Sequence, residues 1–221
     1  MKIASLASIE SRSHIVGRVV QSLLNQTEVL NQINVYCNDW DGNTIPKHPS
    51  VIIHEHVVGD LGDVGKLFGI NRGYNFLCDD DIIYPKNYVS HLRSKIDFHQ
   101  KIVGVHGVIL NPVVENYFKD RKVIHFRSQS SDTPVHLIGT GTFAYHSKFF
   151  EPALLEIDKQ NMTDCYLAVQ AQEQKVGMVC VSRPSMWLKD IKIKDTLWAT
   201  RGDGGEQTEV INRINNWKFY E

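Results

Sequence analysis

Apolar and polar positions alternate along the first ninety residues in blocks that predict strands and helices in turn. The short apolar runs Lys2–Ala7 and Ile33–Cys37 are typical of buried strands. Two further runs, Val51–His56 and Tyr74–Cys78, predict strands joined by a short helix at about 64–71. Between the first two runs, apolar residues recur at the spacing of one helical face, namely Ile15, Val16, Val19, Val20, Leu23 and Leu24.

The same alternation continues through the second half of the chain. Helical spacing predicts helices over Pro85–Asp97, over Thr163 to about Gln174, and near Gln207–Trp217. Because strands and helices alternate, we expect an α/β fold with a mainly parallel central sheet and ligand sites at the carboxyl ends of its strands. The remaining predicted strands are Ile102–His106, Val123–Phe126, Val135–Ile138 and Met178–Val181, with a loop at Gly139–Thr142.

Composition restricts the partners. The 221 residues include 24 Lys and Arg against 25 Asp and Glu, a formal net charge of -1, so no overall field attracts nucleic acid or an anionic membrane. The start at Met1–Ser5 lacks the apolar stretch of a signal peptide, and no window has the apolar length of a membrane span. Four scattered cysteines without C-x-x-C spacing indicate reduced core thiols. We therefore expect one soluble cytoplasmic domain.

Three consecutive carboxylates, Asp79, Asp80 and Asp81, follow the strand predicted at Tyr74–Cys78. In an extended segment Asp79 and Asp81 share one side, and their like charges resist burial unless a cation, protons or hydrogen-bond donors compensate them. Oxygen ligands at a strand end suit Mg²⁺ or Mn²⁺. The alternative is an acidic turn that caps the helix beginning at Pro85.

Several motifs in order resemble a GT-A glycosyltransferase, most closely one of the family 2 type. These are the opening strand, the turn bearing Arg12, the segments Ser22–Gln26 and Val35–Asp39, and the D-x-D of Asp79–Asp81. The likeness is strong over residues 1–90 and looser over 139–187. It implies a Rossmann-like single domain whose residues 1–90 bind a nucleotide sugar and whose residues 91–221 bind the acceptor. A capsid-glycosylating enzyme of a large DNA virus, acting in the host cytoplasm, is one identity it implies.

The resemblance also implies the substrates. The donor is a sugar nucleotide, usually UDP-linked, with Mn²⁺ or Mg²⁺ on its diphosphate, and the acceptor is a hydroxyl of a glycan or glycoprotein. Two other functions stay open on the residues alone. One is a glycan-binding domain that keeps the fold without catalysis, and the other is a sugar-nucleotide pyrophosphorylase or phosphatase with an acidic metal site.

Candidate donor-binding residues lie at the ends of the first two strands. Ala7 and Ser8 offer little bulk and exposed backbone to a uracil ring, or form an ordinary strand-to-helix connection. Arg12 can bind phosphate oxygens in a bidentate manner, or be solvated at a helix start. By resemblance, Asp39 accepts a hydrogen bond from the uracil imide. Asn38 stands where the family has an acid, and its amide donates as well as accepts.

Roles near the acidic triplet also follow from the resemblance. Asp81 coordinates the metal directly, Asp79 contacts the metal or the ribose hydroxyls, and Asp80 contacts the sugar or supports its neighbours. Lys66 neutralises donor phosphate or touches the ribose. The alternative for Lys66 is a surface ion pair with Asp63 at i to i+3 spacing.

Asp164 matches the acidic residue that precedes an apolar helix in the family. As general base it takes the proton of the acceptor hydroxyl while that oxygen attacks the anomeric carbon, with inversion. Helix capping is its alternative role. The polar, glycine-containing stretch Lys189–Glu206 predicts a flap over the donor, or a loose connection before the last helix.

Overall fold

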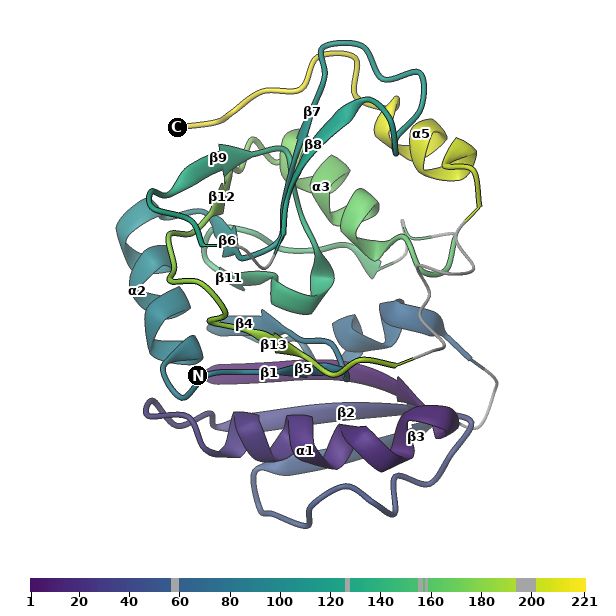
Figure 1. Cartoon of the computed structure of the whole chain (residues 1–221), viewed down its shortest axis with the longest axis vertical. Helices are drawn as coiled ribbons and strands as arrows, with labels where there is room; N and C mark the ends of the chain where they lie inside the picture. The colour runs from purple at the N-terminus through teal and green to yellow at the C-terminus, as the bar shows by residue number, and fades with distance from the viewer. Residues whose placement is uncertain (57–59, 126–127, 155–156, 158, 194–201) are drawn as a thin grey trace.

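The computed structural model describes residues 1–56, 60–125, 128–154, 157, 159–193 and 202–221. Its first half alternates strands with helical segments, as the apolar pattern predicts (Figure 1). In chain order the elements are β1 (Lys2–Ile9), the 3₁₀ turn η1 (Glu10–Arg12), α1 (Ser13–Leu24), β2 (Gln32–Asn38), β3 (Val51–His56), the 3₁₀ segment η2 (Gly62–Gly69), β4 (Tyr74–Leu77), β5 (Ile82–Ile83) and α2 (Tyr88–His99).

The second half contributes shorter strands and two helices. The elements are β6 (Ile102–Gly104), β7 (Gly107–Leu110), β8 (Arg121–Ile124), β9 (Thr133–Val135), β10 (Leu137–Ile138), the 3₁₀ turn η3 (Thr140–Thr142), β11 (Ala144–His146), α3 (Thr163–Glu173), β12 (Met178–Cys180), β13 (Lys189–Asp190) and α5 (Gly205–Ile211).

An eight-stranded sheet forms the centre, in the order β3-β2-β1-β4-β11-β6-β12-β9. β1 is parallel to both β2 and β4, and β12 is parallel to β6. β11 is antiparallel to its neighbours β4 and β6, and β9 is antiparallel to β12. The predicted α/β fold with a mainly parallel central sheet is therefore confirmed.

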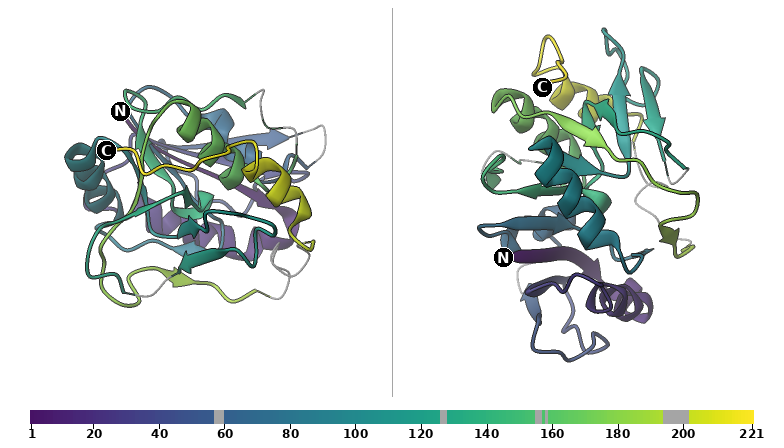
Figure 2. Two further views of the ribbon diagram at one scale, coloured as in Figure 1. Left: turned by 90° about the horizontal axis from the view of Figure 1, so that it is seen from above. Right: turned by 90° about the vertical axis from the view of Figure 1, so that its left-hand side faces the viewer.

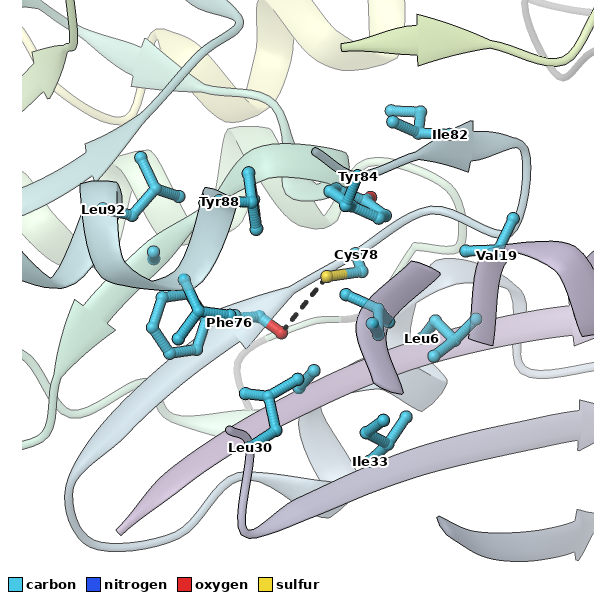
Figure 3. Close-up of a cluster of buried hydrophobic side chains, with 14 of the residues drawn as sticks. Leu6, Val19, Leu30, Ile33, Phe76, Cys78, Ile82, Tyr84, Tyr88 and Leu92 are labelled. Atoms are coloured by element: carbon cyan, nitrogen blue, oxygen red, sulfur yellow. Dashed lines mark hydrogen bonds between the residues drawn. The ribbon is translucent and has the colours of Figure 1, made fainter. Parts of the chain in front are cut away.

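Side chains alternate along each strand and build an apolar core on either face of the sheet. Phe76 of β4 belongs to the core that packs against α1 and α2, whereas the next residue, Leu77, belongs to the core that packs against α3 and α5. Figure 3 shows Phe76 and Cys78 among apolar side chains from β1, β2 and α2. α2 covers the sheet on the side that faces the viewer in the right-hand view of Figure 2.

The helical stripe predicted from the sequence is the buried face of α1. Ile15, Val16, Val19, Val20 and Leu23 are at most 4% exposed, and Leu24 packs half-buried at the edge of the same core. This face closes the sheet beneath β1 and β2. The turn bearing Arg12, which joins β1 to α1, is therefore held at the carboxyl end of β1.

The structure differs from the sequence-based expectation in its short elements. β5, β7, β11 and β13 were not predicted, and three of these four strands have only two or three residues, too few to show a period. The helix expected at about 64–71 is the 3₁₀ segment η2, and the last helix ends at Ile211 rather than near Trp217. The flap expected over Lys189–Glu206 falls partly on residues 194–201, outside the described residues, while its start pairs with β5 as β13.

The structure gives the state of the four cysteines and the length and polarity of the helices. Cys37, Cys78, Cys165 and Cys180 are all buried free thiols, as the scattered spacing indicates. Within the described parts of the chain, every helix is too short or too polar to cross a bilayer.

Phe76→Ala tests the packing beneath β4. We expect a loss of about 3–5 kcal/mol in the free energy of unfolding, because the 0% exposed ring leaves a cavity in the core. Urea titration followed by circular dichroism measures this loss. Phe98→Ala is the matched control, since Phe98 is 79% exposed and should change stability by less than about 0.5 kcal/mol. Equal losses in the two variants would contradict this packing.

Candidate functional site

Three parallel strands end side by side at one edge of the sheet. Ile9 at the end of β1 pairs with Asn38 at the end of β2, and Ser5 of β1 pairs with Leu77 at the end of β4. The chain leaves β4 through Cys78 directly into the acidic triplet Asp79–Asp81. Parallel pairing therefore brings the candidate residues of β1, β2 and β4 to a single edge, where α/β folds bind ligands.

The three carboxylates differ in exposure because the chain turns at Asp80. Asp79 still follows the line of β4, whereas Asp80 and Asp81 form a turn before β5. The side chains of Asp79 and Asp81 are 37% and 25% exposed, and that of Asp80 is 4% exposed. Two carboxylates thus face solvent at the edge of the sheet and the middle one is buried, as expected for the triplet, although a turn rather than an extended strand produces this arrangement.

Arg12 compensates the buried carboxylate. Its guanidinium Nη1 donates to Asp80 Oδ1 and lies 3.7 Å from Asp81 Oδ2. Burial lowers the pKa of Arg12, but the charges of Asp80 and Asp81 outweigh burial and raise it. Burial also keeps the pKa of Asp80 above its ordinary value despite this pair. Arg12 is thus not a solvated arginine at a helix start but part of the acidic turn, and its binding of phosphate stays a prediction.

Lys66 compensates Asp79 from the opposite side. The residue is 3% exposed, and its ammonium donates to Asp79 Oδ1 and to Thr140 Oγ1, the latter at 3.4 Å. Burial opposes the charged form of both partners, but their mutual attraction outweighs it, raising the pKa of Lys66 and lowering that of Asp79. The surface ion pair with Asp63 that the spacing favours is wrong, because Asp63 instead accepts a hydrogen bond from Thr163 Oγ1 at 2.7 Å.

The turn at Thr140–Thr142 fixes Asp79 against the second half of the chain. The Asp79 backbone N–H donates to the Tyr84 hydroxyl at 2.8 Å, and this hydroxyl donates to the Gly141 carbonyl at 2.7 Å. A Cβ on Gly141 would stand 2.0 Å from Asp79 Oδ2, so only glycine fits here. Sequence reasoning missed Tyr84, and the glycine-rich run was the only signal for this contact.

The charges in the acidic turn do not balance. In the part of the chain that the structure describes, the three carboxylates meet two cations, Arg12 and Lys66, which leaves one negative charge. Burial, with the charges of Asp79 and Asp80, raises the pKa of Asp81 to about 6. An excess negative charge on carboxylate oxygens fits a hard divalent cation. Among the described residues, however, no group of three or more His, Cys, Asp or Glu could hold a metal alone, so further ligands must come from a substrate or water.

Asp164 lies near the same edge through its neighbour Thr163. Thr163 begins α3 and donates to Asp63 on η2, the segment that also carries Lys66. Burial and the charge of Asp63 raise the pKa of Asp164 to about 6. Asp164 Oδ1 also accepts the Cys165 backbone N–H at 2.9 Å within the first turn of α3, although Asp164 is not the N-cap residue, which is Met162.

The residues at the ends of β1 and β2 shape the adjoining loops. The Ser8 carbonyl accepts the indole N–H of Trp40 at 3.2 Å. Asn38 donates to the Gly62 carbonyl and accepts the Leu61 N–H, both at 3.3 Å. An ionised acid could accept from Leu61 but could not donate to Gly62. This explains why an amide stands at position 38.

Asp39 and Ala7 stand at the rim of this edge. Asp39 is exposed, and its backbone has a φ of 59°, in the left-handed region. Such a conformation is tolerated by Asp and directs the chain away from the sheet after β2. Ala7 is half-buried and lies against η2, where a Cβ on Gly65 would stand 3.4 Å from the Ala7 Cβ.

Neither a protein-family profile nor a curated protein matches the chain significantly. Solved structures do match. The complex of S. aureus TarS residues 1–349 with UDP-GlcNAc superposes with a TM-score of 0.58 at 12% identity, over 91% of this chain and 62% of that one. The chain shares with this structure a GT-A-like α/β fold. The UDP complex of the same TarS fragment and a further structure of that fragment each give a TM-score of 0.52, at 12% and 13% identity, over 84% of this chain and 59% of theirs. The chain thus spans about three fifths of the TarS fragment.

Gly141→Ala tests the contact between the turn and Asp79. We expect a loss of about 1–3 kcal/mol in the free energy of unfolding, because the new methyl group displaces the carboxylate from Lys66. Thermal and urea unfolding measure the loss. In Gly202→Ala the added Cβ meets nothing within 4 Å, so this control should stay within about 0.5 kcal/mol of wild type. A fully stable Gly141→Ala protein would show that the carboxylate is not confined there.

Proposed function

We propose that the protein is a metal-dependent glycosyltransferase that moves a sugar from a UDP-linked donor to a hydroxyl of a glycan or glycoprotein acceptor, with inversion. The observation that carries the proposal is the acidic turn Asp79–Asp81 at the carboxyl edge of β4 in a GT-A-like fold. A solved structure of similar fold holds UDP-GlcNAc. The family 2 type and the viral capsid-glycosylating identity stay predictions.

In this proposal the donor binds to residues 1–90. The small side chains of Ala7 and Ser8 leave room for uracil beside β1, and the exposed Asp39 accepts from its imide. Asn38 acts on the base indirectly, since its amide holds the backbone of Leu61 and Gly62. Arg12 and Lys66 place positive charge beside the diphosphate, and Asp80 orients Arg12.

Asp79 and Asp81 would hold Mn²⁺ or Mg²⁺. Their side chains are the two more exposed members of the triplet, and the turn carries one negative charge that the ion pairs of the described residues do not compensate. When bound, such an ion stabilises the charge that develops on the departing diphosphate. Because these cations keep water and phosphate oxygens in their remaining positions, two protein carboxylates suffice.

Asp164 would act as the general base toward the acceptor, which binds to residues 91–221. Burial beside Asp63 brings the pKa of Asp164 to about 6, within reach of a working pH near neutrality. The link through Thr163 and Asp63 holds this carboxylate next to the segment that carries Lys66. A nearby base on the acceptor side supports attack opposite the leaving diphosphate and hence inversion.

Donor binding and turnover together test the proposal. Calorimetry with a set of UDP-sugars, with and without Mn²⁺, should show metal-dependent binding, and UDP release should follow when an acceptor is added. Affinity for a glycan without donor turnover would support a glycan-binding domain instead. Release of inorganic phosphate or pyrophosphate would support a sugar-nucleotide-processing enzyme. Absence of nucleotide binding would contradict the glycosyltransferase and the sugar-nucleotide-processing enzyme.

Asp81→Asn should weaken Mn²⁺ binding in the presence of UDP at least about 10-fold, because an amide replaces a charged ligand of the ion. Electron paramagnetic resonance of free Mn²⁺ measures the affinity. Glu173→Gln, an exposed change on α3, is the control for the loss of one negative charge. Unchanged Mn²⁺ affinity in Asp81→Asn would remove Asp81 from the metal site.

The pH profile of kcat tests Asp164. A general base works when deprotonated, so kcat should be constant above about pH 7 and fall as the pH drops through about 6, the raised pKa of this carboxyl. Saturating Mn²⁺ keeps the nearby Asp81 deprotonated during the measurement. Asp164→Asn should lower kcat by about 10²–10⁴ and leave the Kd for UDP unchanged. A flat profile between pH 5 and 8 would exclude this role.

A further inference from the structure

Lys66 already occupies the carboxylate that a metal ion of the proposed function would use. Its ammonium pairs with Asp79 Oδ1 and contacts Thr140 Oγ1 at 3.4 Å, and the residue is 3% exposed. A buried lysine stays charged only where an opposite charge offsets its desolvation. The charge of Asp63 also favours the ammonium, but the ion pair of Lys66 is with Asp79. A cation that draws Asp79 away therefore removes the principal partner of Lys66 unless another anion takes its place.

The second oxygen of Asp79 is also confined. Oδ2 faces Gly141 so closely that an added Cβ would stand 2.0 Å away. A divalent cation that binds Asp79 thus enters beside the ammonium of Lys66, on the same carboxylate. Two cations at such short range repel each other strongly away from bulk water. The nucleotide-free protein therefore binds a metal ion poorly at Asp79, because the ammonium of Lys66 repels it.

Arg12 does not hinder metal binding at Asp79 in this way. Its principal partner is Asp80, the buried carboxylate, and it lies 3.7 Å from Asp81. Neither oxygen of Asp79 is paired with Arg12 among the ion pairs of the described residues. Of these two cationic side chains, it is therefore Lys66 that would compete with a metal ion for Asp79.

We propose that Lys66 and the divalent ion compete for Asp79, and that the diphosphate of the nucleotide relieves the competition by accepting Lys66. This proposal rests on the proposed function and adds an order to it: the ion binds weakly to the free protein and tightly once the nucleotide is present. Because coupling between two ligands is reciprocal, the ion strengthens nucleotide binding by the same factor.

Mn²⁺ binding to the nucleotide-free protein tests the competition without any turnover. Lys66→Gln keeps a hydrogen-bond donor toward Asp79 and removes the charge, so it should bind Mn²⁺ roughly 10-fold more tightly than wild type, within the range usual for coupled sites. Lys66→Arg keeps the charge and should bind like wild type. Lys47→Gln removes an exposed charge and should change nothing. An affinity in Lys66→Gln equal to or weaker than wild type would overturn the proposal.

A second measurement uses the wild-type protein and does not depend on the stability of a variant. The ¹⁵N resonance of the Lys66 ammonium should move when Mg²⁺ saturates the protein, and move again when UDP is added. A resonance that stays unchanged at saturating Mg²⁺ would overturn the competition. UDP that fails to bind at all would instead contradict the proposed function, so the two failures are distinct.

Discussion

The mutual repulsion of three adjacent carboxylates is the constraint that organises this edge of the molecule. Asp79, Asp80 and Asp81 leave β4 together, and a folded chain can bury part of this charge only by bringing cations to it. Arg12 arrives from the β1–α1 turn and Lys66 from η2, each paired with a different carboxylate. The positions of both segments follow from this need for charge compensation as much as from apolar packing.

The same edge connects the two halves of the chain. Tyr84 bridges the acidic turn to Gly141 through its hydroxyl, and Thr163 joins α3 to η2 through Asp63. These contacts are polar, buried and few, whereas the cores on the two faces of the sheet are large and apolar. A site built on a rigid sheet with a small number of polar links keeps its carboxylates in place, with Asp79 and Asp81 more exposed than Asp80.

The strands and helices of the central sheet could be predicted from the sequence because the spacing of apolar residues is set within each short segment. The stripe of α1 and the runs of β1 to β4 follow from spacing alone, and parallel pairing then places the acidic triplet at the ligand-binding edge. The ion pairs could not be predicted in this way. Arg12 and Asp80 are 68 residues apart, and Lys66 has a nearer acid, Asp63, at helical spacing. The acid that Lys66 binds depends on the 3₁₀ geometry of η2 and on the turn η3, whose Thr140 also contacts Lys66.

Anomalous diffraction at the manganese edge, from crystals grown with Mn²⁺ and UDP, tests the central claim most directly. The account predicts one manganese peak bonded to Asp79, Asp81 and diphosphate oxygens, with Arg12 still on Asp80. UDP bound at the ends of β1 and β2 without manganese at these carboxylates, or manganese bound elsewhere, would contradict it.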